Sequence, residues 1–422
     1  MSKTVQSVKG MRDLLPPETA VWAAVEAVAR RVFTSYGYGE IRTPILEETE
    51  LFVRGVGEST DIVGKEMYTF PDKKGRSLTL RPENTAAVAR AYVEHNLREL
   101  PPPVKLFYIG PQFRYERPQQ GRYRQFYQIG AELLGDPGPA ADGELILMLV
   151  RFLGELGFRD LTVLLNTVGD EASRTAYREA LVAFLEPHRD RLGEDSRRRL
   201  ETNPLRILDT KVPAERGLLQ GAPELADHLS VESREHFQAV LAILDRFDVP
   251  YRVESRLVRG LDYYTRTVFE ITAGGLGSQD AVVGAGRYDR LISDLGGPEV
   301  PAIGFAIGLD RLIHILPEEL SKSALPPPPV AVVVVGEVGF TEGLDLAEAL
   351  RSRGVTAVPE LSSRSLKAAL KRADRLGSRF VLILGDDELA AGEVTVKDLR
   401  SGEQRRLPRT EAIDLMTRGE TV

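Results

Sequence analysis

Four consecutive prolines, Pro326 to Pro329, interrupt this chain of 422 residues. Because proline lacks a backbone N–H and fixes its φ angle, such a run forms neither a helix interior nor a central strand, and it predicts a stiff linker. A length of 422 residues also exceeds one ordinary hydrophobic core, at roughly 150 residues per domain. We therefore expect separate domains over 1–325 and 330–422, joined by the linker 326–329.

The segment after the prolines alternates β-branched runs with amphipathic patterns. Strands are predicted at Val330–Val335, Val355–Val358 and Phe380–Leu384, and helices at Thr341–Arg353 and Ser363–Leu376, with Ser362 or Ser363 as the N-cap of the second helix. Alternating strands and helices predict a small α/β domain with a mostly parallel sheet.

The segment before the prolines is less regular. Glycine, proline and aromatic residues are dense over about 41–135 and again over 259–308, whereas 170–249 is polar and rich in helical patterns. We interpret 1–325 as an α+β domain built on an antiparallel sheet and interrupted by a helical insertion at 170–249.

Composition and missing motifs exclude several classes of protein. The chain has no cysteine, which excludes disulfides, thiol nucleophiles and cysteine-based zinc or iron–sulfur sites. Its five histidines lack metal-ligand spacing, and neither a phosphate-binding G-x-x-x-x-G-K-[ST] loop nor a G-x-S-x-G elbow occurs. With 55 basic and 62 acidic residues the net charge is −7, so any RNA contact must use local basic patches.

Targeting and membrane signals are missing from the sequence as well. The N-terminus has no signal-peptide pattern, and no apolar run approaches the ~20 residues of a membrane span. We therefore expect a cytoplasmic protein without membrane contact.

Three clusters of arginine, aromatic and carboxylate residues are candidates for a site, and the first is Leu80–Thr85. Arg81 precedes a proline and is pushed out of helix, so Glu83 to Thr85 lie at the start of the helix predicted from Ala86. Glu83 is then either a cap stabilised by the helix dipole or a buried carboxylate that faces a polar ligand.

The second cluster, over 105–132, is a strand, a polar loop rich in Pro, Gly, Gln and Arg, and a returning strand. Because side chains alternate along a strand, Phe126, Gln128 and Glu132 share one face. That face is unsuited to a hydrophobic core, and it suits an aromatic ring that stacks on a base beside polar groups that orient a ligand. A solvated sheet face would explain Gln128 alone, but it explains the set poorly.

The third cluster includes Gly304 and Gly308 and runs into a helix predicted at Leu309–Leu316. Arg311 lies in the first turn of that helix, where the dipole disfavours a cation unless an anion is nearby. A local conflict of this kind is typical of a functional site.

Together these segments resemble the class II aminoacyl-tRNA synthetases, specifically the histidyl-tRNA synthetase family. The three class motifs resemble Arg42–Thr49, whose Pro44 would lie at a dimer interface, Phe113–Pro118 with its returning strand, and Gly304–Arg311. Two stretches peculiar to the histidine enzymes resemble Leu257–Tyr264 and Gly286–Asp289, and 330–422 resembles the family's anticodon-binding domain. Asn84 stands where the family usually has glycine.

The resemblance implies a homodimeric enzyme that activates L-histidine with ATP and Mg²⁺, without zinc, and transfers it to tRNA(His). It implies that Arg259 and Arg114 are catalytic at the α-phosphate. The implied histidine pocket comprises Glu83, Asn84, Thr85, Arg114, Gln128, Glu132, Arg259, Tyr263 and Tyr264. The implied ATP site comprises Arg114, Glu116, Phe126 stacked on adenine, and Arg311 at the γ-phosphate.

Contacts with tRNA are expected in three places. The resemblance implies that Arg117 and Gln119 meet the extra 5′ guanosine of tRNA(His). Arg364, Lys367, Lys371 and Arg375 are spaced to form one helical stripe, which is either a solvated charged face or a tRNA contact. We expect the insertion 170–249 to contact the acceptor arm, and not to hydrolyse mischarged tRNA.

A second hypothesis is the non-catalytic regulatory subunit of ATP phosphoribosyltransferase, which resembles the same catalytic domain. That relative typically lacks the anticodon-binding domain and has a degraded Arg259 segment. Both features are present in this chain, which favours the enzyme. A zinc-dependent threonine enzyme is disfavoured because there is no cysteine.

Overall fold

The computed structural model describes residues 4–57, 60–119, 121–208, 210, 212–257, 261, 263–273, 281–336, 339–360 and 365–418, the side chain of Arg206 excepted. The chain divides into two compact units, Met1–Ala324 and Leu325–Val422. Each unit has a hydrophobic core of its own, and each is described by itself. Among the described residues, no helix has the length and apolar character needed to cross a membrane.

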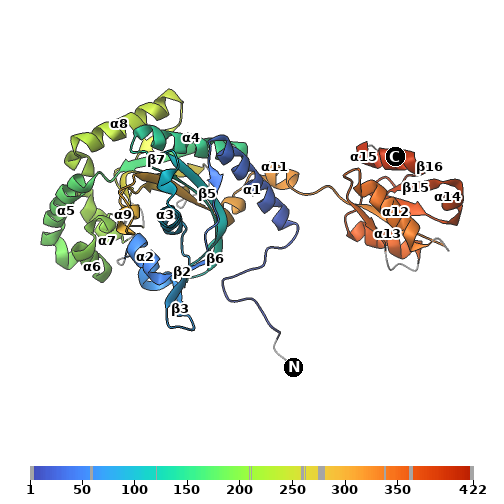
Figure 1. Ribbon diagram of the computed structural model, residues 1–422, viewed down its shortest axis with the longest axis horizontal. Coiled ribbons are helices and arrows are strands. Elements are labelled where there is room, and N and C mark those ends of the chain that lie inside the picture. Colours follow the sequence, from blue (N-terminus) through green and yellow to red (C-terminus); the bar gives the residue numbers. More distant parts are fainter. Residues whose placement is uncertain are drawn as a thin grey trace. The chain divides into compact units, whose positions relative to one another are not determined.

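An eight-stranded sheet is the centre of the first unit (Figure 1). Its strands, in spatial order, are β1 (Gly39–Glu40), β5 (Val104–Phe113), β6 (Gln125–Leu134), β11 (Ala302–Gly308), β10 (Ala281–Arg287), β9 (Thr265–Ala273), β7 (Leu161–Thr167) and β8 (Tyr251–Val253). The internal pairs are antiparallel, and only the edge pairs β1–β5 and β7–β8 are parallel within the described chain. The predicted antiparallel α+β fold is therefore confirmed.

Parallel neighbouring strands must be joined by a long crossover connection, and both parallel edge pairs have one. Residues 168–250 connect β7 to β8, and they contain the helices predicted for the insertion. These helices are α5 (Glu171–Leu185), α6 (Glu194–Thr202), α7 (Pro213–Leu218) and α8 (Val231–Arg246), with short 3-10 turns at Glu186–Arg191, Pro204–Ile207, Leu219–Gly221 and Leu225–His228. The helical segment is thus the crossover between two strands of the main sheet.

The first and last helices of this crossover begin on caps that contact each other. The carboxylate of Asp170 accepts from the Ser173 amide (2.8 Å), and the Ser230 hydroxyl accepts from the Ser233 amide (3.1 Å). Ser230 also donates to Asp170 (2.5 Å). Burial alone would raise the pKa of Asp170, but hydrogen bonds from Ser230 and Ser173 outweigh it and lower the pKa to about 2.

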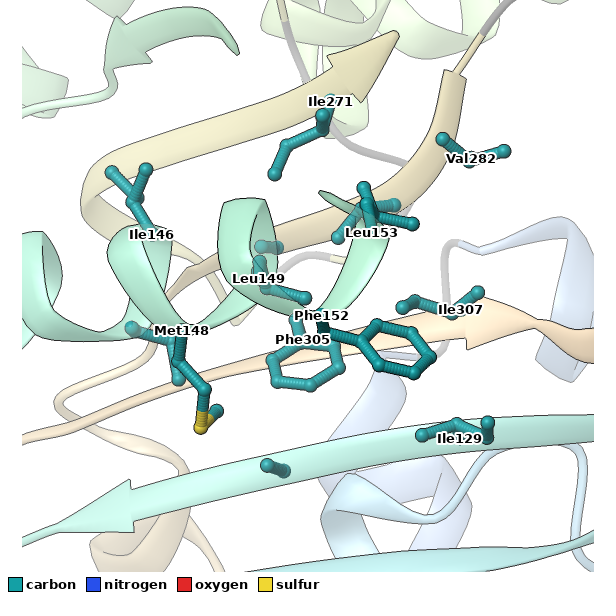
Figure 2. Packing of buried hydrophobic residues seen from close by; sticks show 14 of the residues in the cluster. Ile129, Ile146, Met148, Leu149, Phe152, Leu153, Ile271, Val282, Phe305 and Ile307 are labelled. Carbon is teal, nitrogen blue, oxygen red and sulfur yellow. The ribbon is translucent and has the colours of Figure 1, made fainter. Parts of the chain in front are cut away.

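The two faces of the main sheet differ because side chains alternate along each strand. One face carries large apolar residues and is covered by α1 (Glu18–Ser35) and α4 (Pro139–Glu155). Figure 2 shows α4 lying across these strands, with Leu149 and Phe152 near Phe305 and Ile307. This face is the principal core. On part of the opposite face a second apolar cluster packs strand residues such as Leu134 and Val268 against α3.

A three-stranded antiparallel sheet and several short helices complete the first unit. The strands are β2 (Leu46–Glu48), β4 (Ser77–Leu80) and β3 (Tyr68–Pro71), and the helices are α2 (Thr49–Val56), α3 (Thr85–Glu94), α9 (Leu291–Asp294), α10 (Leu309–His314) and α11 (Glu318–Ser323), with a π-helical turn at Ile62–Glu66 and a 3-10 turn at Leu97–Glu99. Buried Arg81 connects the two sheets, because its guanidinium donates to the carbonyls of Pro111 and Thr43, each at 2.9 Å.

The second unit is a five-stranded sheet with helices. Its strands, in spatial order, are β13 (Ala357–Pro359), β12 (Val330–Val334), β14 (Phe380–Leu384), β15 (Glu393–Asp398) and β16 (Gln404–Pro408), and its helices are α12 (Phe340–Arg351), α13 (Leu366–Arg375), α14 (Asp386–Ala391) and α15 (Arg409–Arg418). The predicted α/β class and the strand Phe380–Leu384 are confirmed.

Two expectations for this unit are wrong. The sheet is mixed and not mostly parallel, because 385–392 and 399–403 are too short for a crossover and therefore make β15 and β16 antiparallel neighbours. The N-cap of α13 is Ser365, whose hydroxyl accepts from the Ala368 amide (3.4 Å), whereas Ser362 and Ser363 lie outside the described residues.

We predict that Phe33→Ala lowers the free energy of unfolding of the first unit by about 3–5 kcal/mol, because it empties a fully buried site. The Phe33 ring packs against Phe107, Phe152 and Phe305, with ring centres 5.3–5.7 Å apart. Urea unfolding is followed by the fluorescence of the single tryptophan, Trp22, which is buried in the same core. The matched control, Phe247→Ala, removes an exposed ring and should change stability by less than about 0.5 kcal/mol. Equal effects of the two substitutions would contradict the packing argument.

Candidate active site

The site lies on the sheet face opposite α4, which we call the binding face. Strand register places Gln128 beside Gly308 and Glu132 beside Gly304. A Cβ atom at Gly304 would overlap the carboxylate of Glu132, so only glycine fits there. The predicted shared face of Phe126, Gln128 and Glu132 is consistent with the register of β6 with β5 and β11, and the carboxylate of Glu132 fills the space over Gly304.

Glu132 is a fully buried carboxylate held by two hydroxyls. Its Oε1 accepts from Thr85 Oγ1 (2.7 Å), and its Oε2 bonds to the Tyr288 hydroxyl (2.5 Å). Burial raises the pKa of Glu132 to about 8, and the charge of Glu83 adds to this, although the hydroxyls act in the opposite direction. A neutral carboxyl group at this position can both donate and accept, which suits recognition of a polar ring.

The sequence left two interpretations of Glu83 open, a helix cap or a buried carboxylate, and the structure shows both features at this residue. Its carboxylate accepts from the amides of Thr85 (2.7 Å) and Ala86 (3.0 Å), so it caps the start of α3. It is also buried, and that burial raises its pKa. Glu83 therefore caps α3 and also lies near enough to Glu132 for its charge to affect the pKa of that residue.

Three tyrosines lie close together near Glu132, and Tyr288 contacts it directly. The ring centre of Tyr263 lies 4.8 Å from that of Tyr264 and 5.6 Å from that of Tyr288, and all three rings are buried. Tyr263 and Tyr264 were predicted as site residues, and Tyr288 was missed. Its position directly after β10, within the stretch Gly286–Asp289, was the available signal.

Arg114 lies at the other end of the binding face, close to Phe126. Its Nε donates to the Pro82 carbonyl (2.8 Å), and its guanidinium carbon lies 5.4 Å from the centre of the Phe126 ring. A carboxylate oxygen of Glu116 is 3.9 Å from Nη1 of Arg114, and the other is 3.6 Å from Nη1 of Arg122. The arrangement places a cation beside the face of an aromatic ring, a contact in which each group stabilises the other.

Arg311 is brought to the same end by the loop between β5 and β6. It is the third residue of α10, and a Cβ atom at Gly121 in the loop would lie 4.0 Å from its Cα. The exposed residues Arg117 and Gln119 belong to this loop, which contains an isolated bridge between Gln119 and Arg122.

Gln128 is buried on the binding face, and no hydrogen-bond partner for its Oε1 is found among the described residues.

Asn84 fits the position where the family usually has glycine. Its φ is −119°, so the backbone there does not need glycine, and its Oδ1 accepts from the Thr43 hydroxyl (2.7 Å). Arg259, with Gly260 and Asp262, lies outside the described residues.

A buried cluster of charged residues fixes the backbone next to Tyr288. No sequence pattern indicated this cluster. Arg287 precedes this tyrosine, is fully buried and contacts Oδ1 of Asp142 at 2.5 Å, while His236 Nε2 lies 2.8 Å from Oδ2 of the same carboxylate. His236 is on α8 and Asp142 is on α4. The cluster therefore connects the helical crossover to the strand that carries Tyr288.

An antiparallel sheet with an arginine and an aromatic ring at one end and a buried cluster of carboxylates and tyrosines at the other is the architecture of a class II aminoacyl-tRNA synthetase. The family model described as histidyl-tRNA synthetase matches residues 10–312, and that described as anticodon binding domain matches 329–418. The chain belongs to the histidyl-tRNA synthetase family.

Curated relatives and a solved structure agree with this membership over nearly the whole chain. The chain is 52% identical to the histidine–tRNA ligase of Nitratidesulfovibrio vulgaris (strain Hildenborough) over 410 residues, which are 97% of each protein. It is 51% identical to that of Halorhodospira halophila, over 98% of this chain and 97% of the relative. The crystal structure of apo histidyl-tRNA synthetase from S. aureus is similar, with a TM-score of 0.81, 35% identity and coverage of 98% of this chain and 100% of that one.

We predict that the stability of the ligand-free chain falls as pH rises and that Glu132→Gln reduces this fall. The pKa of Glu132 is raised from 4.5 to about 8, so its contribution is complete below pH 4.5 and is lost as pH rises through about 8. Glutamine imitates the neutral carboxyl group and does not titrate.

The measurement is urea unfolding, followed by Trp22 fluorescence, at several pH values between about 5 and 9. The control variant, Glu50→Gln, changes an exposed carboxylate and should retain the wild-type pH dependence. The same pH dependence in Glu132→Gln as in the wild type would show that Glu132 does not titrate in this range.

Proposed function

We propose that the chain is a histidine–tRNA ligase, which converts L-histidine and ATP into histidyl-adenylate and pyrophosphate and then transfers histidine to the 3′-terminal adenosine of tRNA(His). The observation that carries this function is about 50% identity to curated histidine–tRNA ligases over nearly full length. The buried cluster of carboxylates and tyrosines around Glu132 supports it, because polar and aromatic groups that could bind an imidazole ring lie on the same sheet face as Arg114 and Phe126.

The histidine pocket in this proposal is lined by the carboxylates and tyrosines of the binding face. Glu83 and Glu132 would hydrogen-bond the two imidazole nitrogens, with Thr85 near the α-amino group. The other proposed contacts are Asn84, Arg114, Gln128, Arg259, Tyr263 and Tyr264. An amino acid without matching polar atoms would not form these two hydrogen bonds in a buried site, and sites built for such bonds reject analogues by ~10⁴–10⁵ without editing.

The ATP site in this proposal lies at the arginine-rich end. Phe126 would stack on adenine, Arg114 would contact the α-phosphate and the histidine carboxylate, and Arg311 would contact the γ-phosphate. Charge develops on the α-phosphate and the leaving pyrophosphate, and fixed arginines stabilise that charge without reorganising. The backbone and ring contacts of Arg114 hold it in place before the substrate arrives.

A magnesium ion is also part of the proposal. No group of three or more histidine or acidic side chains that could hold a metal is found among the described residues, so the phosphates of ATP would have to supply most of its ligands. Glu116, which lies beside Arg114 at the proposed ATP end, is a carboxylate that could join them. Mg²⁺ is usually bound by one or two carboxylates together with substrate phosphates, whose charge it neutralises.

The sequence had left the regulatory subunit of ATP phosphoribosyltransferase as an alternative from a different class, and the identity to curated histidine–tRNA ligases over nearly the whole chain decides for the ligase. The match to an anticodon-binding domain over 329–418 supports the ligase, because that part has no role in a subunit that does not bind tRNA. Histidine-dependent ATP–pyrophosphate exchange with the purified chain separates the two functions, since only the ligase forms the adenylate.

Domain roles, assembly and location are further parts of the proposal. We assign 1–325 to catalysis, 170–249 to an insertion that contacts the acceptor arm without editing, 326–329 to a linker and 330–422 to the anticodon. A homodimer through the segment around Pro44 and a cytoplasmic location rest on family membership. Release of histidine from a mischarged tRNA by this chain would contradict the role given to the insertion.

We predict that Arg259→Ala lowers the rate of pyrophosphate exchange by at least ~10²–10³, the usual loss for one donor to a transition state. The KM for histidine should change less than kcat, because the charge matters most as the α-phosphate reacts. Transfer from preformed adenylate to tRNA should be less affected than adenylate formation.

The matched control is Arg252→Ala, seven residues before Arg259 in the chain. It removes an exposed arginine that pairs with Glu254 (3.6 Å). It should leave exchange unchanged. Normal exchange in Arg259→Ala, or its failure to fold, would show instead that Arg259 has a structural role.

We predict that replacing Lys367, Lys371 and Arg375 by glutamine weakens tRNA binding and leaves pyrophosphate exchange intact. All three side chains are exposed on α13, whereas Arg364, the fourth cation predicted for the stripe, lies outside the described residues. Removal of each cation that neutralises a phosphate reduces the slope of log K against log salt by roughly 0.7–0.9.

Binding of tRNA is measured over a range of salt concentrations. A control variant in which Arg353, Arg400 and Arg405 become glutamine removes the same charge from other exposed positions of the second unit. An equal effect of both variants, or an unchanged tRNA Kd, would identify the stripe as an ordinary solvated face.

A further inference from the structure

A short N-terminal segment, Lys9–Asp13, lies against the loop that carries the proposed ATP-binding residues. We call it the strap. The amide of Arg124 donates to the Gly10 carbonyl (2.7 Å), and Nη1 of Arg124 lies 3.3 Å from the carbonyl oxygen of Lys9. These contacts attach the strap to the point where the loop returns into β6.

Gly10 allows a close approach that another residue would prevent. Its φ is +87°, and a Cβ atom there would lie 2.9 Å from side-chain carbons of both Arg124 and Pro118. The strap backbone therefore contacts two separate parts of the loop, and glycine is required both for the φ angle and for the space.

Arg12 connects the strap to three other elements. Its guanidinium carbon lies 4.7 Å from the centre of the Tyr123 ring in the loop. Its Nη2 is 2.8 Å from Glu18 in α1 and 3.4 Å from Asp310 in α10. Asp310 also accepts from the Tyr127 amide (2.9 Å), so α10, β6 and the loop are positioned relative to one another around Arg12.

The loop also has contacts of its own. Beyond the paired ends of β5 and β6, its two sides are joined by a bond from the Arg114 amide to the Arg124 carbonyl (2.9 Å), by the bridge between Gln119 and Arg122, and by contacts of Arg124 Nε (3.2 Å) and Arg122 Nη1 (3.6 Å) with oxygens of Glu116. The Tyr115 amide also donates to the Glu66 carbonyl (2.7 Å) in the π-helical turn. The Arg124 guanidinium also lies 3.8 Å above the Tyr115 ring. Ordering a polar loop costs conformational entropy, so contacts with a fixed neighbour decide which conformation is populated.

We propose that the strap is a positioning element for the ATP end of the site, and that Arg12 sets the loop against α10 so that Arg114, Phe126 and Arg311 contact one nucleotide together. Arg12 acts through Tyr123 and Asp310, and it is not itself a catalytic residue. The proposal rests on the ATP roles given above to Arg114, Phe126 and Arg311.

The first test is the split between the two substrates in pyrophosphate exchange. Arg12→Ala should raise the KM for ATP roughly tenfold or more, because a catalytic group misplaced by ~1 Å can cost up to ~10²-fold. The KM for histidine should rise clearly less than that for ATP, because Arg114 is the one proposed histidine contact at the end that Arg12 positions, whereas Glu132 and the three tyrosines are held by other elements. Arg12→Lys keeps a cation near Glu18 and Asp310 but loses the planar guanidinium, so it should restore part of the ATP affinity.

The second test needs no activity, so it distinguishes failure of the strap from failure of the ligase assignment. Trypsin cleaves after Arg122, whose side chain is half exposed in the loop. In the ligand-free chain, Arg12→Ala should speed cleavage at this bond at least about fivefold, because a released loop samples extended conformations.

The matched control is Arg30→Ala, which removes another arginine that has two carboxylate partners, Glu26 and Glu40, and that does not contact the loop. It should leave both KM values and the cleavage rate unchanged. An unchanged ATP KM in Arg12→Ala, or an equal rise in the KM of both substrates, would overturn the proposal, and so would cleavage after Arg122 at the wild-type rate.

Discussion

The buried carboxylate of Glu132 is the interaction on which this structure most depends. Burial of a charge in an apolar interior is costly unless the group is hydrogen-bonded or becomes neutral. Here the hydroxyls of Thr85 and Tyr288 contact the two oxygens, and burial raises the pKa to about 8. These partners come from α3 and from the end of β10, and Gly304 of β11 leaves the space that the carboxylate fills. Four parts of the first unit therefore meet at a single side chain.

Buried arginines give the same unit its second set of constraints. Arg81 donates to carbonyls of two separate segments, and Arg287 binds Asp142, which in turn contacts His236. Neither arginine is free to contact a substrate, because each is fixed by protein groups. They hold the turn before α3 and the turn after β10, from which Glu83 and Tyr288 reach the pocket. Arg114 differs, since its guanidinium also lies beside Phe126 on the binding face.

Sequence reasoning succeeded where a local rule applied. Strand alternation placed Phe126, Gln128 and Glu132 on one face, and the register of β6 with β5 and β11 agrees with it. A cation in the first turn of a helix marked Arg311, and α10 does begin at Leu309. Reasoning was wrong for the sheet of the second unit, where connection length and not the strand–helix alternation set the direction of β15 and β16. It missed Tyr288 and Arg12 because each acts through a partner far away in the chain.

The sequence alone determined the division of the chain at its prolines, the faces of the strands and the chemical character of the candidate site, because these depend on backbone restrictions, side-chain alternation and residue type. Tertiary structure decided which polar groups share a pocket. The hydroxyl that fixes Glu132 lies 156 positions later in the chain, and the Asp310 carboxylate beside Arg12 lies 298 positions later. Such pairs form because a buried charge needs a partner from whichever element the fold brings near, and no local pattern specifies which element that is.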